Sequence, residues 1–245
     1  MTRTYHIRPH AYSTMYKRIG ILGGLTPEST VPYYMHIVHR YQEMFHNHAY
    51  PEVVIFSVSF QQFDDWMAVE DWESMELELA KGLRALHGAG ADFAVIATNT
   101  MHNLYHKLDG RNIIPLLSLV DATGAEVKKA GIKKVGLIGT KFAMNKPYYR
   151  EGLAKYGVKV VVPDEEDQKE VGRVIFEELA YGVLKDESRQ NYLAIMERLK
   201  KNGAQGVILG CTEIPLLIKQ EHTKIPVFDT TIIHAEAAFQ HAIKG

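Results

Sequence analysis

The sequence contains almost no cysteine: Cys211 is the single one among 245 residues. One cysteine cannot form an internal disulfide, so the chain is not a disulfide-stabilised secreted domain, and we expect a reducing, cytoplasmic location. An isolated cysteine is most often a buried and inert thiol. A functional role for Cys211 therefore has to be argued from its position in the chain.

An excess of charge of either sign is also missing. The 28 basic residues are balanced by 29 acidic ones, which gives a formal net charge of -1 and no electrostatic reason to expect a nucleic-acid partner. The longest apolar runs, such as residues 158–163 and 206–211, are far too short to span a bilayer, so no membrane partner is expected. Residues 1–16 have no apolar stretch of the secretory type, and we interpret them as an N-terminal extension.

Metal and nucleotide motifs are absent as well. His36 with His39, and His102 with His106, have helical spacings, but neither pair is accompanied by the glutamate or third ligand of a zinc-protease pattern. The glycine-containing loop at residues 20–28 lacks both the G-x-G-x-x-G spacing and the Lys-Ser/Thr ending of a P-loop. We expect no metal and no cofactor.

The sequence does contain short apolar runs that alternate with helical patterns, and continuous apolar strands between helices are typical of parallel sheets covered on both faces. The strands are expected at residues 17–24, 52–60, 92–99, 112–119, 133–140, 158–163, 204–212 and 224–230. The helices are expected at residues 28–45, 72–90, 120–132, 145–157, 167–184, 187–203 and 231–243. Ser29 or Thr30 is the expected N-cap of the first helix, with Pro32 in its first turn.

The landmarks at the strand ends repeat at long range. Gly20 corresponds to Gly136 and Thr98 to Cys211, at separations of about 113 to 116 residues. We therefore predict an α/β protein of two pseudo-symmetric lobes, each with a parallel four-stranded sheet flanked by helices.

The predicted boundaries follow from this repeat. The first lobe covers 17–119 and is joined by the C-terminal helix within 231–245, and the second lobe covers 120–230. In open α/β sheets, ligands bind at the carboxyl ends of the strands. Thr98 and Cys211 both follow a strand, so facing lobes would place them on opposite walls of one cleft.

A hydroxyl and a thiol on opposite walls suit proton transfer at a carbon stereocentre, because one group removes a proton and the other delivers one to the opposite face. A thiol needs help to ionise at neutral pH, and the amides of the segment after Cys211 would supply it. Glu213 would either raise the thiol pKa or orient a proton. Thr98 is the weaker base, and it serves as a proton donor or as a relay for Asn99, Thr100 or His102.

Four ordered motifs give the sequence a resemblance to the aspartate/glutamate racemase family, whose members racemise amino acids without a cofactor. The motifs are GILGGLTPEST at 20–30, TNTMH at 98–102, GCTEI at 210–214 and IPVFDTTIIHA at 225–235. The resemblance implies the two-lobed fold, an acidic amino acid as substrate and a homodimer. Most members carry cysteine in both catalytic motifs, and this chain resembles the subgroup with threonine in the first.

The resemblance also implies the roles of individual residues. Cys211 is the thiolate base on one face of the substrate and Thr98 the donor on the other. The expected substrate-binding residues are Gly24, Leu25, Thr26, His48, Asn99, Thr100, Thr140, Thr212 and Glu213. His48 aligns with a family arginine, and no lysine matches the family lysine near Ala180 and Tyr181, so the partner of an acidic side chain stays open among His48, Lys17, Arg18 and Lys141.

Two alternatives remain from the sequence alone. A decarboxylase or isomerase of the same superfamily that works with one thiol would show the same single cysteine. A small-carboxylate binding protein weakened in catalysis would also keep two lobes around a cleft.

Overall fold

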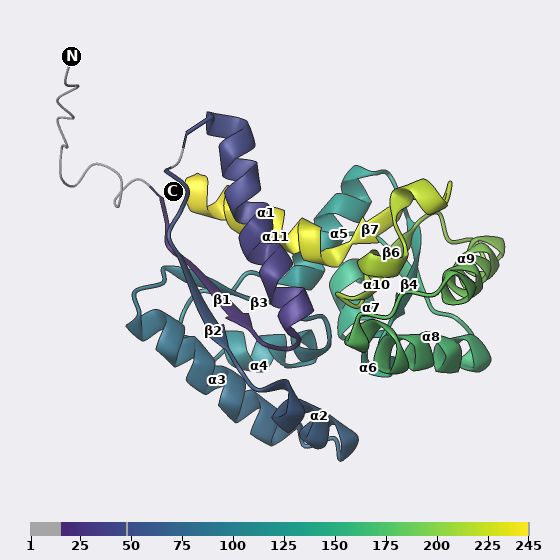
Figure 1. The fold of residues 1–245 in the computed structure, drawn as a ribbon, viewed down its shortest axis with the longest axis horizontal. Coiled ribbons are helices and arrows are strands. Elements are labelled where there is room, and N and C mark those ends of the chain that lie inside the picture. Colours follow the sequence, from purple (N-terminus) through teal and green to yellow (C-terminus); the bar gives the residue numbers. More distant parts are fainter. Residues whose placement is uncertain (1–15, 48, 245) are drawn as a thin grey trace.

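The computed structural model describes residues 16–47 and 49–244, which form two α/β lobes (Figure 1). The parallel sheet of the first lobe has the strand order β2-β1-β3, with β1 at Ile19–Gly23, β2 at Val53–Ser57 and β3 at Phe93–Ile96. The parallel sheet of the second lobe has the order β5-β4-β6-β7, with β4 at Lys134–Gly139, β5 at Lys159–Val161, β6 at Val207–Gly210 and β7 at Val227–Asp229. The two-lobed α/β fold predicted from the sequence is confirmed.

Helices cover both faces of the first sheet. On one face lie α1 (Pro27–Phe45) and α11 (Thr230–Ile243), and on the other lies α3 (Trp72–Gly88). The C-terminal helix α11 follows the last strand of the second lobe but packs beside α1 (Figure 1). There Phe239 joins the buried cluster of Ile21 and Tyr33.

The second sheet is covered in the same way. On one face lie α5 (Leu119–Lys129) and α7 (Tyr148–Ala154), and on the other lie α8 (Glu165–Glu177) and α9 (Asp186–Lys201). Shorter elements complete the fold: α2 (Phe60–Ala68), α4 (Tyr105–Asp109), α6 (Lys141–Asn145), α10 (Ile214–Leu217), and the 3-10 turns η1 (Thr100–Leu104), η2 (Leu179–Tyr181) and η3 (Gln220–His222). No helix in the described part of the chain is long and apolar enough to cross a membrane.

The fourth strand expected in the first lobe, at residues 112–119, is wrong. Only one parallel bridge forms there, between Leu116 and Ala94. Two histidines take the backbone groups that a longer strand would use. The Leu117 carbonyl accepts from Nε2 of His234 at 3.0 Å, and the Leu119 amide donates to Nε2 of His102 at 3.0 Å. These bonds turn the chain into α5 after a single bridge.

Several helix boundaries also differ from the expectation. Helix α1 has Thr26 as its N-cap and Pro27 in its first turn, while Pro32 lies inside the helix, because Thr26 and Ser29 form a capping box. The helix expected at 145–157 is shortened to α7, with the separate short helix α6 before it, and the one expected at 167–184 ends at Glu177. Helix α2 was not expected at all.

Candidate active site

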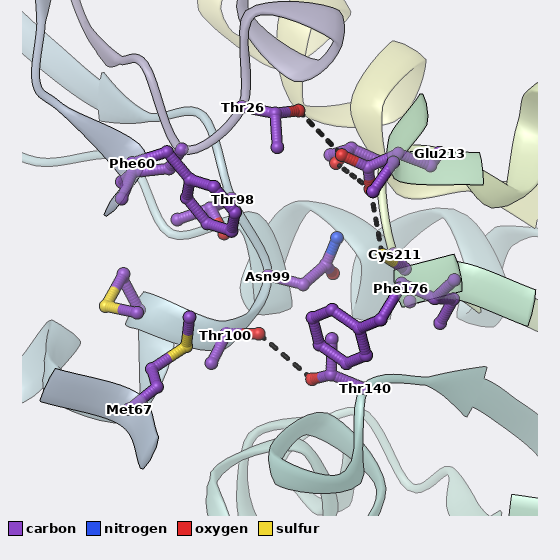
Figure 2. A pocket seen from close by; sticks show the side chains of 16 residues that line it. Thr26, Phe60, Met67, Thr98, Asn99, Thr100, Thr140, Phe176, Cys211 and Glu213 are labelled. Carbon is purple, nitrogen blue, oxygen red and sulfur yellow. Dashed lines mark hydrogen bonds between the residues drawn. The ribbon is translucent and has the colours of Figure 1, made fainter. Parts of the chain in front are cut away.

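A small pocket lies at the carboxyl ends of the strands, with residues of both lobes in its lining (Figure 2). Its cavity volume is about 50 Å³, so its occupant must be a small molecule. The polar part of its lining comprises Thr26, Thr98, Asn99, Thr100, Thr140, Gly210, Cys211, Thr212 and Glu213. The apolar part comprises Leu25, Phe60, Met67, Met101, Ile175, Phe176 and Ala180.

Most residues that the sequence singled out line this pocket together. Thr98 follows β3 and Cys211 follows β6, and each is buried to the same degree, with 7% of its surface exposed. Gly24 does not line the pocket, and His48 lies outside the described residues. The pocket therefore brings the two proposed catalytic residues together, whereas Gly24 lies outside its lining and the role of His48 stays a prediction.

The loop after β1 has two of its backbone amides hydrogen-bonded within its own turn. Gly24 has a φ of 84°, a left-handed conformation suited to glycine, and its amide donates to Thr30 Oγ1 at 2.9 Å. The Thr26 amide donates to Ser29 Oγ at 3.2 Å. Both amides are therefore engaged within the turn, and the binding roles of Gly24 and Thr26 stay predictions.

The Glu213 carboxylate lies at the centre of the hydrogen bonds among the polar lining residues. Its side chain is buried, and it accepts three hydrogen bonds from hydroxyl and thiol groups. Thr26 donates to Oε1 at 2.6 Å, Cys211 to Oε2 at 2.9 Å and Thr212 to Oε2 at 2.8 Å (Figure 2). Donors of this kind satisfy a buried carboxylate, and the bond from Thr26 also joins the first lobe to the second.

The environment of Cys211 favours a thiol over a thiolate. Burial raises the pKa of Cys211 well above its ordinary value, and the Glu213 carboxylate raises it further by its charge and its hydrogen bond. The backbone amides of Thr212 and Glu213 lower the pKa, in the direction expected from the sequence, but they are the weaker influence. At neutral pH the Cys211 thiol is therefore protonated and donates its proton to a hydrogen bond with Glu213.

Two further contacts tie the lobes together at the pocket floor. The hydroxyls of Thr100 and Thr140 are 3.0 Å apart and share one hydrogen bond (Figure 2). The Asn99 side chain donates to Thr230 Oγ1 at 3.0 Å and accepts from the Tyr149 hydroxyl. Each pair leaves hydrogen-bonding capacity for a ligand, since one hydroxyl hydrogen and one amide hydrogen remain.

His102 is not a proton relay, although the sequence allowed that role. The Leu119 amide donates to its Nε2, so Nδ1 carries the proton and donates to the Thr98 carbonyl at 2.7 Å. Burial lowers the pKa of His102 to about 4. The ring is therefore neutral near pH 7, with both nitrogens engaged, and its role is to hold Thr98 and the start of α5 in place.

Because His102 is buried in its neutral form, it makes the stability of the fold sensitive to acid. Its folded-state pKa lies below the usual 6.5, so the neutral ring stabilises the protein above about pH 6.5, and this stabilisation is lost as the pH falls toward 4. Between pH 7 and pH 4.5 the loss amounts to about 2.5 kcal/mol. In His102→Gln, we expect the free energy of unfolding to fall less over this interval, by about that amount.

Urea unfolding at the two pH values measures the difference. His106→Gln is the matched control for the loss of a histidine from the same segment, because His106 is exposed. An identical loss in His102→Gln and wild type would contradict the assignment of a neutral buried ring.

Sequence reasoning missed the apolar wall of the pocket. Phe60 and Met67 come from α2, and Ile175 and Phe176 come from α8. The spacing of Phe60, Phe63 and Met67 carries the helical period and was the available signal. Within the described residues, no group of three or more His, Cys, Asp or Glu side chains is placed to hold a metal ion.

Comparison with known proteins agrees with this geometry. Residues 22–238 match the family described as Asp/Glu/Hydantoin racemase, and the chain belongs to this family. The broad specificity amino-acid racemase RacX of Bacillus subtilis (strain 168) is 24% identical over 225 residues, 89% of this chain and 95% of that protein. The resemblance found in the four motifs is confirmed.

Solved structures show the same fold over nearly the whole chain. An aspartate racemase homologue from Pyrococcus horikoshii OT3 is 39% identical with a TM-score of 0.79, covering 91% of this chain and 98% of that one. The aspartate racemase of Picrophilus torridus is 25% identical with a TM-score of 0.75, covering 91% of this chain and 93% of that one. The expectation of an enzyme of the amino-acid racemase class is confirmed.

Proposed function

We propose that this protein racemises an α-amino acid by cofactor-independent transfer of two protons, with Cys211 on one face of the substrate and Thr98 on the other. The observation that carries the proposal is that these two residues, from different lobes, line one small pocket with a buried carboxylate beside the thiol. Proton removal and proton delivery on opposite faces of one carbon invert its configuration.

The thiol needs a proton acceptor before it can act as a base. Glu213 Oε2 is hydrogen-bonded to Cys211 Sγ and is placed to take the thiol proton, leaving a thiolate and a neutral carboxyl group. This transfer removes the negative charge that raises the thiol pKa. A substrate ammonium group near Glu213 offsets the same charge and works in the same direction.

The protons balance over one cycle. The Cys211 thiolate takes the α-proton, and the Thr98 hydroxyl delivers its proton to the opposite face of the planar intermediate. The enzyme then holds a thiol, a neutral Glu213 and a Thr98 alkoxide. Return of the Glu213 proton to Thr98 through solvent restores the starting state.

The substrate α-carboxylate gains negative charge in the intermediate and needs hydrogen-bond donors. We assign this role to the free hydroxyl hydrogen of the Thr100–Thr140 pair and the free amide hydrogen of Asn99. Thr212, expected from the sequence to share this role, donates its hydroxyl to Glu213 instead. Its part is to hold Glu213 against the thiol.

Aspartate and glutamate are the substrates that the sequence resemblance suggests, and they are the first to test. The support is that relatives bear the names of aspartate racemases and of a broad specificity racemase. A cytoplasmic location and a homodimer also stay predictions from the sequence. Analytical ultracentrifugation of the full chain would test the dimer.

The proposal is tested by α-proton exchange. The protein is incubated in deuterium oxide with separate L- and D-forms of aspartate, glutamate and neutral amino acids, and the α-proton signal is followed by NMR. We expect deuterium at the α-carbon together with appearance of the opposite enantiomer. Binding without exchange or inversion for every amino acid would reject the racemase in favour of a binding protein.

A one-thiol decarboxylase is the second candidate, because the pocket has one thiol and a large apolar wall. In that reaction a carbon–carbon bond of a malonate-like substrate breaks, carbon dioxide leaves, and the thiol protonates the resulting carbanion on one face. Release of carbon dioxide from a substituted malonate, without inversion of any amino acid, would favour this candidate.

A further inference from the structure

The charge in the pocket lining is of one sign only. Glu213 is the only carboxylate among the described lining residues, and that set contains no lysine, arginine or histidine. Among the described residues, no cationic side chain lies within hydrogen-bond distance of the buried Glu213; its three bonds come from Thr26, Cys211 and Thr212. Its Oε1 accepts one hydrogen bond, while Oε2 accepts two, so Oε1 retains room for another donor.

Of the basic residues that the sequence left as candidates, His48 lies outside the described residues and the other three lie away from the pocket. Lys17 and Arg18 precede β1, so they lie at the amino ends of the strands, whereas the pocket is at the carboxyl ends. Lys17 contacts His241 at 3.2 Å, and Arg18 pairs with Glu52 at 2.5 Å. Lys141 is exposed and lines a neighbouring hollow instead.

The side of the pocket formed by α2 and α8 is apolar. Phe60 and Met67 are half-buried, and Phe176 is 44% exposed although it is a large aromatic residue. Figure 2 shows these three side chains around the space that Thr98 and Cys211 also face. A large apolar side chain kept half in solvent at a pocket mouth suits contact with an apolar ligand group.

On the basis of the racemase function proposed above, we propose that the substrate is an α-amino acid with an uncharged side chain, whose ammonium group binds Glu213 Oε1 and whose side chain lies against Phe60, Met67 and Phe176. The substrate ammonium group is both the cationic partner and the additional hydrogen-bond donor that Glu213 can accept. A side-chain carboxylate would enter a buried site that already holds one carboxylate and has an apolar wall, and both the like charge and the lost hydration oppose it.

Matched pairs of amino acids test this proposal. Exchange of the α-proton in deuterium oxide is measured for glutamine and methionine against glutamate, and for asparagine against aspartate, which differ chiefly in charge. We expect kcat/KM for the uncharged members to exceed that of the acids by at least tenfold. Equal or faster exchange of the acids would overturn the side-chain proposal and leave the racemase function standing.

If no amino acid exchanges its α-proton, a binding measurement still tests the preference for an uncharged side chain. Protection of Cys211 against iodoacetamide reports occupancy of the pocket without turnover. We expect methionine and glutamine to protect at concentrations at least tenfold lower than glutamate. Absence of exchange would reject the racemase function, while the order of protection would still support or overturn the preference for an uncharged side chain.

A charge introduced into the apolar wall supplies a second test. Phe176→Lys and Phe176→Met place side chains of similar length at the exposed end of α8 and differ in charge. We expect Phe176→Lys to raise kcat/KM for glutamate relative to methionine at least tenfold over the ratio in Phe176→Met. The same ratio in both variants would overturn the assignment of the side chain to this wall.

Discussion

Replacing Cys211 with serine is expected to abolish both racemisation and α-proton exchange, lowering kcat by about 10³-fold or more while leaving the fold intact. A serine hydroxyl has a far higher pKa than a thiol, so transfer of its proton to Glu213 does not give a usable base. The substitution preserves the hydrogen bond to Glu213 Oε2, because a hydroxyl donates as the thiol does. The loss of activity would therefore reflect the chemistry of the sulfur and not a loss of the hydrogen bonds around Glu213.

Circular dichroism and urea unfolding would establish that the Cys211→Ser variant is folded. Iodoacetamide should inactivate the wild-type enzyme, and substrate should protect it, since Cys211 is the chain's single cysteine and lines the pocket. The raised thiol pKa predicts that alkylation accelerates as the pH rises through the alkaline range. We expect neither a chelator nor added pyridoxal phosphate to change the rate. Full turnover by the serine variant would rule out Cys211 as the base.

The sequence predicted the two walls of the pocket because their signal is local. Thr98 and Cys211 each follow an apolar strand, and the repeat interval relates them. Their meeting in one pocket then follows from parallel topology, which brings the carboxyl ends of strands to one edge. To predict such a pocket, it is enough to know which segments are strands and in which order they follow along the chain.

The sequence could not predict features that depend on contacts between distant segments. The bond from Thr26 to Glu213 joins residues that are far apart in the chain and belong to different lobes. His234 and His102 cut short the expected fourth strand by taking backbone groups of Leu117 and Leu119. Nothing in the local pattern of 112–119 records the presence of these two rings.

The apolar lining residues show a different limit of prediction from sequence. Phe176 occupies a position on an amphipathic helix where core packing is the ordinary explanation, and only the structure shows it 44% exposed at the pocket. In the proposal made above, the substrate preference depends on such residues more than on Thr98 and Cys211. The reaction class was therefore accessible from the sequence, whereas the side chain of the substrate was not.

Replacing Thr98 with cysteine is expected to accelerate turnover of the D-enantiomer more than that of the L-enantiomer, with an increase in kcat for the D-form of up to about 10²-fold. In the mechanism proposed above, Cys211 is the strong base on one wall, and the family resemblance indicates the L-form as the enantiomer whose proton faces it. In the wild-type enzyme, the D-form must be deprotonated by the Thr98 side, which holds a weak base. A thiol at this position removes the asymmetry.

Equilibrium limits how this asymmetry can be observed. The two enantiomers have equal free energy, so kcat/KM is the same in both directions for every variant, and any difference in kcat must be matched by KM. The measurement is therefore kcat for each enantiomer at saturation, by polarimetry or chiral chromatography. In wild type, we expect the larger kcat and the larger KM for the L-form.

Thr98→Ser is the matched control for Thr98→Cys, because both substitutions remove the methyl group and only the second introduces a thiol. Serine should keep the wild-type ratio of the two kcat values, whereas cysteine should bring the ratio toward one. Equal acceleration of both directions by Thr98→Cys, or equal kcat values in wild type, would refute this account of the Thr98–Cys211 pair. A fully active Thr98→Ala variant would assign the second proton to water, because His102 has both ring nitrogens engaged and cannot supply it.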